Sequence, residues 1–493
     1  MVEGSLAILI AFILYLGLML GIGVYYYKKT ANLSDYVLGG RRLGSWVTAM
    51  SAQASDMSAW LLMGLPGAAY ISGFGSIWLA LGLGVGTFLN WQFIAKRLRK
   101  YTEIAGDSLT LSSYFGNRFR DDKNTLKVIS SIIIVFYFAV YTASGFVAGG
   151  KLFGTVFGLD YTLALTIGAI VIVGYTFLGG FMAVSTTDFI QGIVMFVAVV
   201  VLPIVGIFTN GGPFNILDSI RSMNGEFLVP FTDAEGNSLG LLVILSSLAW
   251  GLGYFGQPHI LVRFMAIKSS SQIKTSKKIA MSWVVISLGA AIAIGMVGRV
   301  IIPETLLDSE QVFMIMIDGL LPSIIAGVFL AAVLAAIMST ADSQLLVTAS
   351  AFSEDLYKSI LNKNATQKQL LMVSRITVLA VAVIAYIIAL NPDSSVLDIV
   401  SNAWAGFGSA FGPVVLFSLF WKKMTKLSTV FGMIVGGATV FIWGNLKGGI
   451  FELYEMVPAF LLSCIVIIVV SILDKEPSQE IQDEFDSIVK YKC

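Results

Sequence analysis

The chain has 493 residues, of which 57% are hydrophobic and 12% are charged, whereas soluble domains carry about 25% charged residues. Its formal net charge of +1 gives no indication of a nucleic-acid surface or an acidic partner. Two cysteines and one histidine are too few for a disulfide framework or a multi-histidine metal site. The composition is that of an all-α polytopic membrane protein, with almost no room for a soluble domain.

Apolar runs long enough to cross a hydrocarbon core of about 30 Å recur along almost the whole chain. The first run is too long for a signal-peptide core and has no basic segment before it, so we expect it to remain as a helix. The thirteen predicted spans lie at residues 5–27, 45–71, 76–96, 128–155, 161–182, 189–209, 239–262, 279–303, 322–346, 369–391, 398–421, 428–445 and 457–473.

An odd number of spans puts the two termini on opposite sides of the membrane. With the N-terminus outside, the inner segments hold all 31 lysines and arginines except Lys151, Arg221, Arg299 and Lys447. The positive-inside rule therefore predicts an N-out/C-in topology. We interpret the inner basic clusters as topology anchors in contact with anionic lipid; they are Lys28, Lys29, Arg41 and Arg42; Lys96, Arg97, Arg99 and Lys100; Lys274, Lys277 and Lys278; and Lys422, Lys423 and Lys426.

Two polar stretches, residues 51–60 (SAQASDMSAW) and 335–344 (AAIMSTADSQ), interrupt apolar spans. The first contains the carboxylate of Asp56, and ionisable groups inside a membrane usually mark an ion or substrate pathway. In the second, helical spacing puts several small and hydroxyl residues on one face: Ala336, Ser339, Thr340 and Ser343. Carbonyl and hydroxyl oxygens suit Na⁺. The alternative is that each hydroxyl bonds back to its own helix.

The span 239–262 contains Gly251, Gly253, Gly256 and Pro258 close together. Its GLGYFG segment matches the dinucleotide-binding pattern, but no strand precedes it and no βαβ unit surrounds it, so we reject that interpretation. Glycines and a proline instead predict a helix that is broken in the membrane. Broken backbone at that depth is tolerated where it lines a cavity or is buried in protein, which makes residues 250–258 a binding-site candidate.

Spans two to six and seven to eleven form two sets of five, and each set begins with an interrupted helix. Because five is odd, the second set runs opposite to the first, which predicts an inverted repeat around a midplane site. We predict one transmembrane domain at residues 1–475 and a cytoplasmic tail at residues 476–493. The repeats cover about 45–209 and 239–421, and the flanking helices are 5–27, 428–445 and 457–473.

Several motifs carry a family resemblance: LGGRRLG (38–44), SAQASDMSAWLLMGLPG (51–67), WGLGYFGQPHILVRFMA (250–266), AAIMST (335–340), EDLYK (354–358) and WAGFGSAFGPVVLFSLFW (404–421). The chain resembles the sodium:solute symporter family, and within it the bacterial sodium/proline symporters, from the first helix to about residue 475. The resemblance implies the LeuT-type five-plus-five inverted repeat.

The resemblance also implies site residues. Sodium would bind the carbonyls of Ala54, Met57 and Ala336 and the hydroxyls of Ser339 and Thr340. Asp56 would support sodium coupling, and Arg41 would have a role linked to coupling on the inner side. Aromatic faces and half-helix ends suit the ring and carboxylate of L-proline; the implied substrate residues are Ser55, Met57, Ser58, Tyr141, Trp250, Tyr254 and Pro258.

Two residues depart from the family pattern: Gln53, where a small residue is usual, and Asp342, which adds a carboxylate beside the hydroxyl face. Asp188, in STTDFIQ, resembles an acid that many members retain. We predict that Asp188, Thr340, Asp342 and Ser343 form a further cation site; the alternative is that Asp342 is solvated near the inner vestibule. We expect His259 to be a packed residue and Arg263 to snorkel or pair near the inner face.

The resemblance and the topology together imply a secondary-active symporter of the bacterial cytoplasmic membrane, and the resemblance implies that it imports L-proline with Na⁺ by alternating access. We expect no enzyme activity and no organic cofactor, since the chain has neither a histidine-based dyad nor a P-loop motif. One alternative keeps Na⁺ coupling and changes the solute to another amino acid, pantothenate or a sugar acid. The other is a transporter-derived sensor, although the tail leaves no room for a kinase domain. The oligomeric state stays open.

Overall fold

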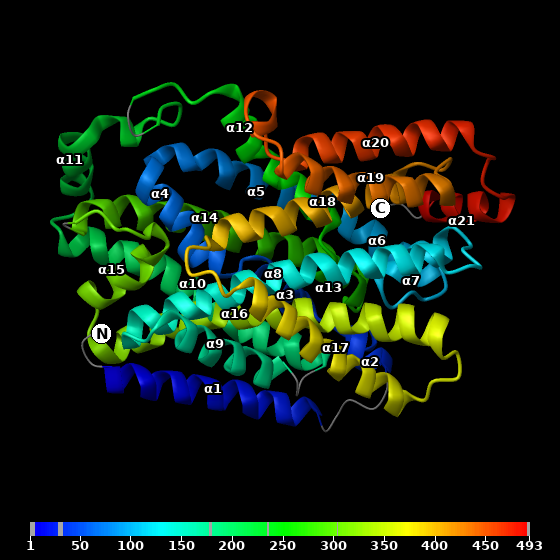
Figure 1. The fold of residues 1–493 in the computed structure, drawn as a ribbon, viewed down its shortest axis with the longest axis horizontal. Helices are drawn as coiled ribbons and strands as arrows, with labels where there is room; N and C mark the ends of the chain where they lie inside the picture. The colour runs from blue at the N-terminus through cyan, green and yellow to red at the C-terminus, as the bar shows by residue number, and fades with distance from the viewer. Residues whose placement is uncertain (1–4, 28–32, 177–179, 234–235, 303, 491–493) are drawn as a thin grey trace.

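The computed structural model describes residues 5–27, 33–176, 180–233, 236–302 and 304–490. These residues are almost entirely helical, because a backbone that crosses a membrane must satisfy its own hydrogen bonds. Most of the long helices run along the long axis of the molecule (Figure 1). The chain begins at one end of this bundle, and the last helix lies at the other end (Figure 1). Lys28 and Lys29, two of the expected basic anchors, lie outside the described residues.

The helices (α) and the short or widened helical turns (η) follow in chain order. In the first half they are α1 (Ser5–Tyr27), α2 (Leu33–Leu38), η1 (Gly39–Arg41), α3 (Ser45–Asp56), η2 (Trp60–Gly64), α4 (Leu65–Ser72), η3 (Gly73–Ser76), α5 (Ile77–Leu89), η4 (Asn90–Ile94), α6 (Ala95–Ile104), α7 (Leu111–Arg118), α8 (Thr125–Phe157), α9 (Tyr161–Thr176), α10 (Phe181–Thr209), α11 (Pro213–Asn224) and η5 (Gly225–Leu228).

In the second half they are α12 (Leu241–Ala249), η6 (Trp250–Gly256), α13 (Pro258–Ala266), η7 (Ser270–Gln272), α14 (Ile273–Ile301), η8 (Ser309–Gln311), α15 (Val312–Leu320), α16 (Ser323–Ser350), η9 (Ala351–Leu361), α17 (Gln367–Ile388), α18 (Val396–Phe420), α19 (Lys426–Gly444), η10 (Gly449–Glu452), α20 (Met456–Leu473) and α21 (Gln479–Lys490).

By length and composition, 10 helical runs of the described residues are able to cross a membrane, and 11 if the bent pair Leu241–Gly256 and Pro258–Ala266 counts as one span. Two features explain the difference from the thirteen predicted spans. The run Trp60–Ile104 covers parts of two predicted spans, 45–71 and 76–96. The apolar part of α9, Tyr161–Gly174, is too short to count by itself.

The predicted break in the span 239–262 is confirmed. After α12 the chain tightens into η6, and Gln257 is extended (φ −80, ψ 107) before Pro258 starts α13. The axis bends by 45° there. A second break, which the sequence did not indicate, ends α3 at Asp56; Met57 leaves the helical region (φ −82, ψ 76), and a widened turn resumes at Trp60.

Glycine lets η6 lie unusually close to its neighbours. A Cβ on Gly86 of α5 would stand 2.2 Å from the carbonyl oxygen of Gly251. A Cβ on Gly253 would stand 1.9 Å from the indole nitrogen of Trp404 on α18. Both contacts are below any real Cβ distance, so these glycines fix the depth at which the broken helix packs.

Helix α16 lies in the centre of the molecule and is one of four helices that pack against the broken α3, with α10, α13 and α14. It packs against α1, α3, α8, α9, α10 and α17. Of the residues in its most apolar stretch, 83% are buried. The second break, at η6, packs against α5 and α18. The two breaks and the polar stretch of α16 thus meet inside the bundle.

The tail helix α21 is docked at one end of the bundle, near α6 and α7 (Figure 1). Arg120 pairs with Glu480 at 3.0 Å and with Glu484 at 2.6 Å, and Lys422 pairs with Asp486 at 2.6 Å. These contacts hold the tail against the segments that follow α7 and α18.

Candidate functional site

The broken end of α3 is joined to α16 by hydroxyl groups. Ser339 Oγ donates to the carbonyl oxygen of Ala54 at 2.7 Å, and Thr340 Oγ1 donates to the same oxygen at 3.4 Å. Ser339 also lies 3.3 Å from the carbonyl oxygen of Ala336 in its own helix. The shorter bond of Ser339 therefore crosses between helices, and all four residues are buried.

These contacts gather four of the five residues expected to bind sodium. The fifth, Met57, lies at the break itself, three positions after Ala54. The cluster offers carbonyl and hydroxyl oxygens and no formal anion, which is the ligand chemistry that suits Na⁺.

Asp56 connects the two breaks. Its Oδ2 accepts a hydrogen bond from the hydroxyl of Tyr254 at 2.7 Å, and its carbonyl accepts from Trp60 Nε1 at 3.0 Å. The other carboxylate oxygen, Oδ1, is buried and has no hydrogen-bond partner among the described residues. A buried carboxylate oxygen without a donor is costly unless a cation or a donor reaches it.

All seven expected substrate residues are buried: Met57 and Ser58 follow the end of α3, Trp250, Tyr254 and Pro258 lie at the second break, Tyr141 lies on α8, and Ser55 lies on α3. The hydroxyl of Tyr141 is buried without a hydrogen-bond partner among the described residues. Its ring packs edge-on against His259, with ring centroids 6.0 Å apart. His259 is fully buried, as expected of a packed residue.

Trp404 is a residue of this region that the sequence did not single out. Its indole nitrogen donates to the carbonyl oxygen of Trp250 at 2.8 Å, and its ring stands edge-on to Tyr254 at 5.0 Å. It therefore supplies a hydrogen bond to backbone freed in η6. The motif WAGFGSAF could have pointed to this role, because it places a Trp beside small residues that allow close packing.

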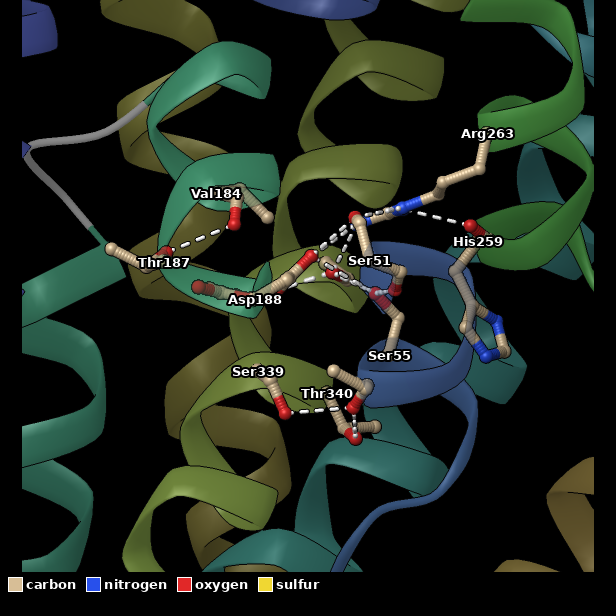
Figure 2. A network of polar contacts seen from close by, with 12 residues as sticks. Ser51, Ser55, Val184, Thr187, Asp188, His259, Arg263, Ser339 and Thr340 are labelled. Carbon is tan, nitrogen blue, oxygen red and sulfur yellow. Dashed lines mark hydrogen bonds and ion pairs between the residues drawn. The ribbon is translucent and has the colours of Figure 1, made fainter. Parts of the chain in front are cut away.

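A second polar cluster lies beside the sodium candidate, and Figure 2 shows Ser51, Ser55, Asp188 and Arg263 pointing toward one another. Asp188 Oδ2 accepts from Ser51 Oγ at 2.6 Å, from Ser55 Oγ at 3.2 Å and from Arg263 Nη2 at 3.2 Å. We call this set the Arg263 cluster; its members are Ser51, Ser55, Asp188, Arg263, Asp342 and Ser343.

Ser343 ties the Arg263 cluster to α16. Its hydroxyl bonds with Arg263 Nη2, lies 2.9 Å from Ser55 Oγ, and is 3.4 Å from Asp342 Oδ1. The hydroxyl of Ser55, expected at the substrate, thus lies in this cluster. Asp342 is fully buried, so the alternative of a solvated group at the inner vestibule is wrong.

Arg263 pairs with Asp188, which is one of the two expectations for it; the other, that it snorkels to the surface, is wrong. Its side chain is fully buried, and Nη1 donates to the carbonyl oxygen of His259 at 2.7 Å. Its burial could have been inferred from its position in PHILVRFMA, because it is a charged residue within a short apolar helix that follows a break. Arg263 pairs with Asp188 and reaches Asp342 through the hydroxyl of Ser343, and Asp188 Oδ1 and Asp342 Oδ2 have no hydrogen-bond partner among the described residues.

Arg41 joins three segments at the start of α3. It donates to Asp107 Oδ1 at 2.9 Å, to the carbonyl oxygen of Ser108 at 2.9 Å, and to that of Met265 at 2.6 Å. These contacts join η1 to the end of α13 and to the loop after α6. Arg41 therefore contacts the second broken helix at Met265. It precedes α3, whereas the sodium candidate lies at the other end of that helix.

Comparison with known proteins finds relatives that are named as proline transporters. The chain is 48% identical to the high-affinity proline transporter PutP of Bacillus subtilis, over 95% of this chain and 98% of that one. It is 46% identical to the osmoregulated proline transporter OpuE of the same organism, over 96% of each chain. It is 44% identical to a sodium/proline symporter of Staphylococcus aureus, over 96% of this chain and 94% of the other.

Two solved structures share the fold. A Na⁺-coupled sialic acid symporter, in a substrate-bound outward-open state, superposes with a TM-score of 0.80 at 20% identity and covers 96% of this chain and 99% of its own. The nucleobase–cation symporter Mhp1 superposes with a TM-score of 0.54 at 15% identity, covering 92% and 99%. The expected LeuT-type fold of a multi-pass helical transporter is confirmed.

The model of the sodium:solute symporter family matches residues 36–436, which is most of the chain and includes both breaks, Asp56 and the polar stretch of α16. This family couples solute transport to Na⁺, so the chain is a transporter and Na⁺ is its coupling ion. The resemblance seen in the motifs is confirmed: the chain belongs to the sodium:solute symporter family.

Proposed function

We propose that the chain imports L-proline together with Na⁺ across the bacterial cytoplasmic membrane. The observation that carries the proposal is the 2.7 Å contact between Ser339 Oγ and the carbonyl oxygen of Ala54, since it joins the break in α3 to α16 through Na⁺-compatible oxygens. The names of the Bacillus and Staphylococcus relatives supply the solute.

Na⁺ would bind the carbonyls of Ala54, Met57 and Ala336 and the hydroxyls of Ser339 and Thr340. Ser339 and Thr340 would then turn their protons away from Ala54 and offer lone pairs to the ion. Bound Na⁺ would hold α3 against α16, favour the outward-open state and so prepare the substrate pocket, which is the differential binding that coupling requires.

Proline would bind between the breaks. The rings of Tyr141, Trp250 and Tyr254 would cover its apolar ring, with Ser58 and Pro258 at the helix ends. Two buried polar atoms there lack hydrogen-bond partners within the part of the chain that the structure describes: Asp56 Oδ1, an acceptor, and the Tyr141 hydroxyl, a donor. They suit the ammonium and carboxylate of a small zwitterion.

The driving forces are sufficient without ATP. One charge that crosses about 100 mV contributes roughly 2.3 kcal/mol, and a tenfold Na⁺ gradient adds about 1.4 kcal/mol. Together they sustain accumulation of a zwitterion by roughly several hundred-fold at one Na⁺ per cycle.

The proposed topology is thirteen spans with the N-terminus outside and the C-terminus inside, and a cytoplasmic tail from residue 476. The backbone of Gly73 supports two spans within the run Trp60–Ile104, because its φ of +62 ends α4 before α5 begins. The proposed repeats, about 45–209 and 239–421, each start with a broken helix.

A further cation site at Asp188, Thr340, Asp342 and Ser343 is the second part of the proposal. The two carboxylate oxygens without partners, Asp188 Oδ1 and Asp342 Oδ2, favour it. The guanidinium of Arg263 opposes it, since it already brings a positive charge to Asp188. We therefore propose that this site forms only in a state in which Arg263 has moved away.

Uptake of labelled proline by proteoliposomes tests the function. Inward Na⁺ gradients should drive accumulation, and K⁺ gradients of equal size should not. Pantothenate, sialic acid and other amino acids serve as competing solutes at excess. Accumulation without Na⁺, or competition by a solute other than proline at much lower concentration, would contradict the proposal.

A further inference from the structure

A basic pocket opens at the inner end of the bundle, away from the two breaks. It has a volume of about 520 Å³ and lies between η4 and α6, the start of α14, and the last residue of α18. Four cationic side chains line it: Lys96, Arg97, Lys274 and Lys277. No aspartate or glutamate is among its described lining residues.

The lysines of the pocket differ from other lysines at the same end of the bundle. Lys100, Lys422, Lys423 and Lys426 each pair with a carboxylate, at 3.5, 2.6, 3.4 and 2.6 Å. By contrast, no carboxylate in the described part of the chain lies within 4.0 Å of Lys96, Lys274 or Lys277. Lys277 donates instead to the amide oxygen of Gln92, at 2.5 Å.

The start of α14 adds positive potential to the pocket. Helix N-termini carry a partial positive charge and favour acidic residues in the first turn. The first turn of α14 contains no acidic residue and instead carries Lys274. No side chain caps this terminus, whose preceding turn, η7, contributes Ser270 and Ser271 to the pocket. A bound anion would offset this accumulation.

Aromatic side chains form the rest of the wall. Trp91 and Phe420 line the pocket, and the guanidinium of Arg97 lies 4.6 Å from the ring centroid of Phe420. Aromatic rings beside lysines and arginines mark the level of lipid headgroups, and basic pockets between helices on the inner side bind phospholipid heads. The volume exceeds what inorganic phosphate alone would fill.

We propose that this pocket binds the phosphate of an anionic phospholipid. The shared chemistry is a phosphate-bearing anion, and the aromatic wall favours a headgroup of the surrounding bilayer over a soluble phosphate. Because Phe420 ends α18 while the cations come from α6 and α14, the bound lipid holds three helices together at the inner end. The inference does not depend on which solute is transported.

Native mass spectrometry of the full-length protein tests the proposal. The delipidated protein is mixed with equal amounts of phosphatidylglycerol and phosphatidylcholine, and the retained lipids are counted. The test variant is Lys96→Gln/Lys274→Gln. The control is Lys363→Gln/Lys368→Gln, which removes the same charge from exposed lysines outside the pocket. The test variant should retain phosphatidylglycerol about tenfold more weakly than the wild type, and the control should match the wild type.

A second arm distinguishes the source of the phosphate. Thermal unfolding in a neutral detergent is followed with inorganic phosphate or chloride at equal ionic strength. A shift produced by phosphate in the wild type and absent from Lys96→Gln/Lys274→Gln would assign the pocket to soluble phosphate and overturn the lipid assignment. Equal retention of phosphatidylglycerol by the test variant and the control would overturn the site altogether.

The single variant Lys274→Gln protects the test against a folding defect. Its side chain is exposed, so the substitution leaves the packing intact. Weaker retention of phosphatidylglycerol in this variant, restored by Lys274→Arg, would support the proposal. Unchanged retention in both would count against it.

Discussion

Arg263 and Asp188 form an ion pair at 3.2 Å in which both side chains are fully buried. The pair links α13, which follows the second break, to α10. Ser51 and Ser55 on α3, the helix that also carries Ala54, bond to it directly. One buried charge pair therefore ties α3, α10 and α13 together beside the sodium candidate.

Removing one partner of this pair should destabilise the protein strongly. Asp188→Asn or Arg263→Gln leaves a buried charge unpaired, which costs about 3–5 kcal/mol in comparable sites. The double variant should lose less stability than the two single variants together. Denaturant unfolding of the purified protein measures the coupling. The exposed pair Arg221–Asp218 is the control, since it has the same 3.2 Å separation but exposures of 65% and 72%; its coupling should stay below about 1 kcal/mol.

Ser339→Ala should weaken sodium binding while the protein stays folded. The substitution removes an oxygen that lies 2.7 Å from the Ala54 carbonyl. We expect the Na⁺ concentration for half-maximal proline uptake to rise about tenfold, equivalent to about 1.4 kcal/mol. Ser350→Ala is the matched control on the same helix, because its buried hydroxyl bonds only to Leu346 of that helix, at 2.7 Å. An equal effect of both substitutions would argue against a sodium ligand at Ser339.

Tyr254→Phe should remove the side-chain hydrogen bond that connects the two breaks. It removes the hydrogen bond to Asp56 Oδ2 and leaves both carboxylate oxygens without a side-chain donor. Hydrogen bonds to charged groups contribute about 1.5–3 kcal/mol, so Na⁺-driven uptake should fall roughly tenfold to a hundredfold. Tyr386→Phe removes a hydroxyl that lies 2.7 Å from Thr166 at the periphery and should transport normally. Normal uptake by Tyr254→Phe would exclude this coupling.

Gly253→Ala should abolish transport through packing alone. The added Cβ would stand 1.9 Å from the indole nitrogen of Trp404, which also bonds to Trp250. Overpacking of this kind costs about 1–3 kcal/mol and displaces η6 from the substrate region. Gly289→Ala on α14 meets nothing within 4 Å and should leave uptake unchanged. Proteoliposome uptake, with the amount of folded protein measured by gel filtration, separates the two outcomes.

Asp342→Ala tests the further cation site. If that site takes part in transport, the Hill coefficient of uptake for Na⁺ should fall, because one coupled ion is lost. Replacement of a buried carboxylate next to Arg263 should change stability whether or not an ion binds there, so stability alone does not decide the matter. An unchanged Na⁺ dependence and Hill coefficient would show that the extra site is not used.

The sequence predicted the architecture well because membrane helices are specified by length and apolarity. The break at residues 250–258 was predictable too, since glycine and proline weaken a helix locally. The sodium candidate followed from hydroxyl spacing on one face of α16 and from the motifs. In each case the signal lies within a few neighbouring residues.

What the sequence did not reveal depends on contacts between distant segments. By its sequence position, Arg263 resembles an arginine whose charged end reaches the membrane surface. Only its contact with Asp188 allows its side chain to be buried. Ser55 has the neighbours of a substrate residue, yet its hydroxyl lies with Ser343, 288 positions away along the chain. Trp404 acquires its role only because Gly253 lets η6 approach it.

The break in α3 has a consequence for biogenesis. Residues 51–60 contain neither glycine nor proline, so nothing local interrupts the helix when this segment first enters the membrane. The groups that fix the broken form are Tyr254, 198 positions after Asp56, and Ser339, 285 positions after Ala54. We therefore expect the segment to insert as a continuous helix and to unwind only after α16 has been synthesised, so that the ion site is among the last parts of the protein to mature.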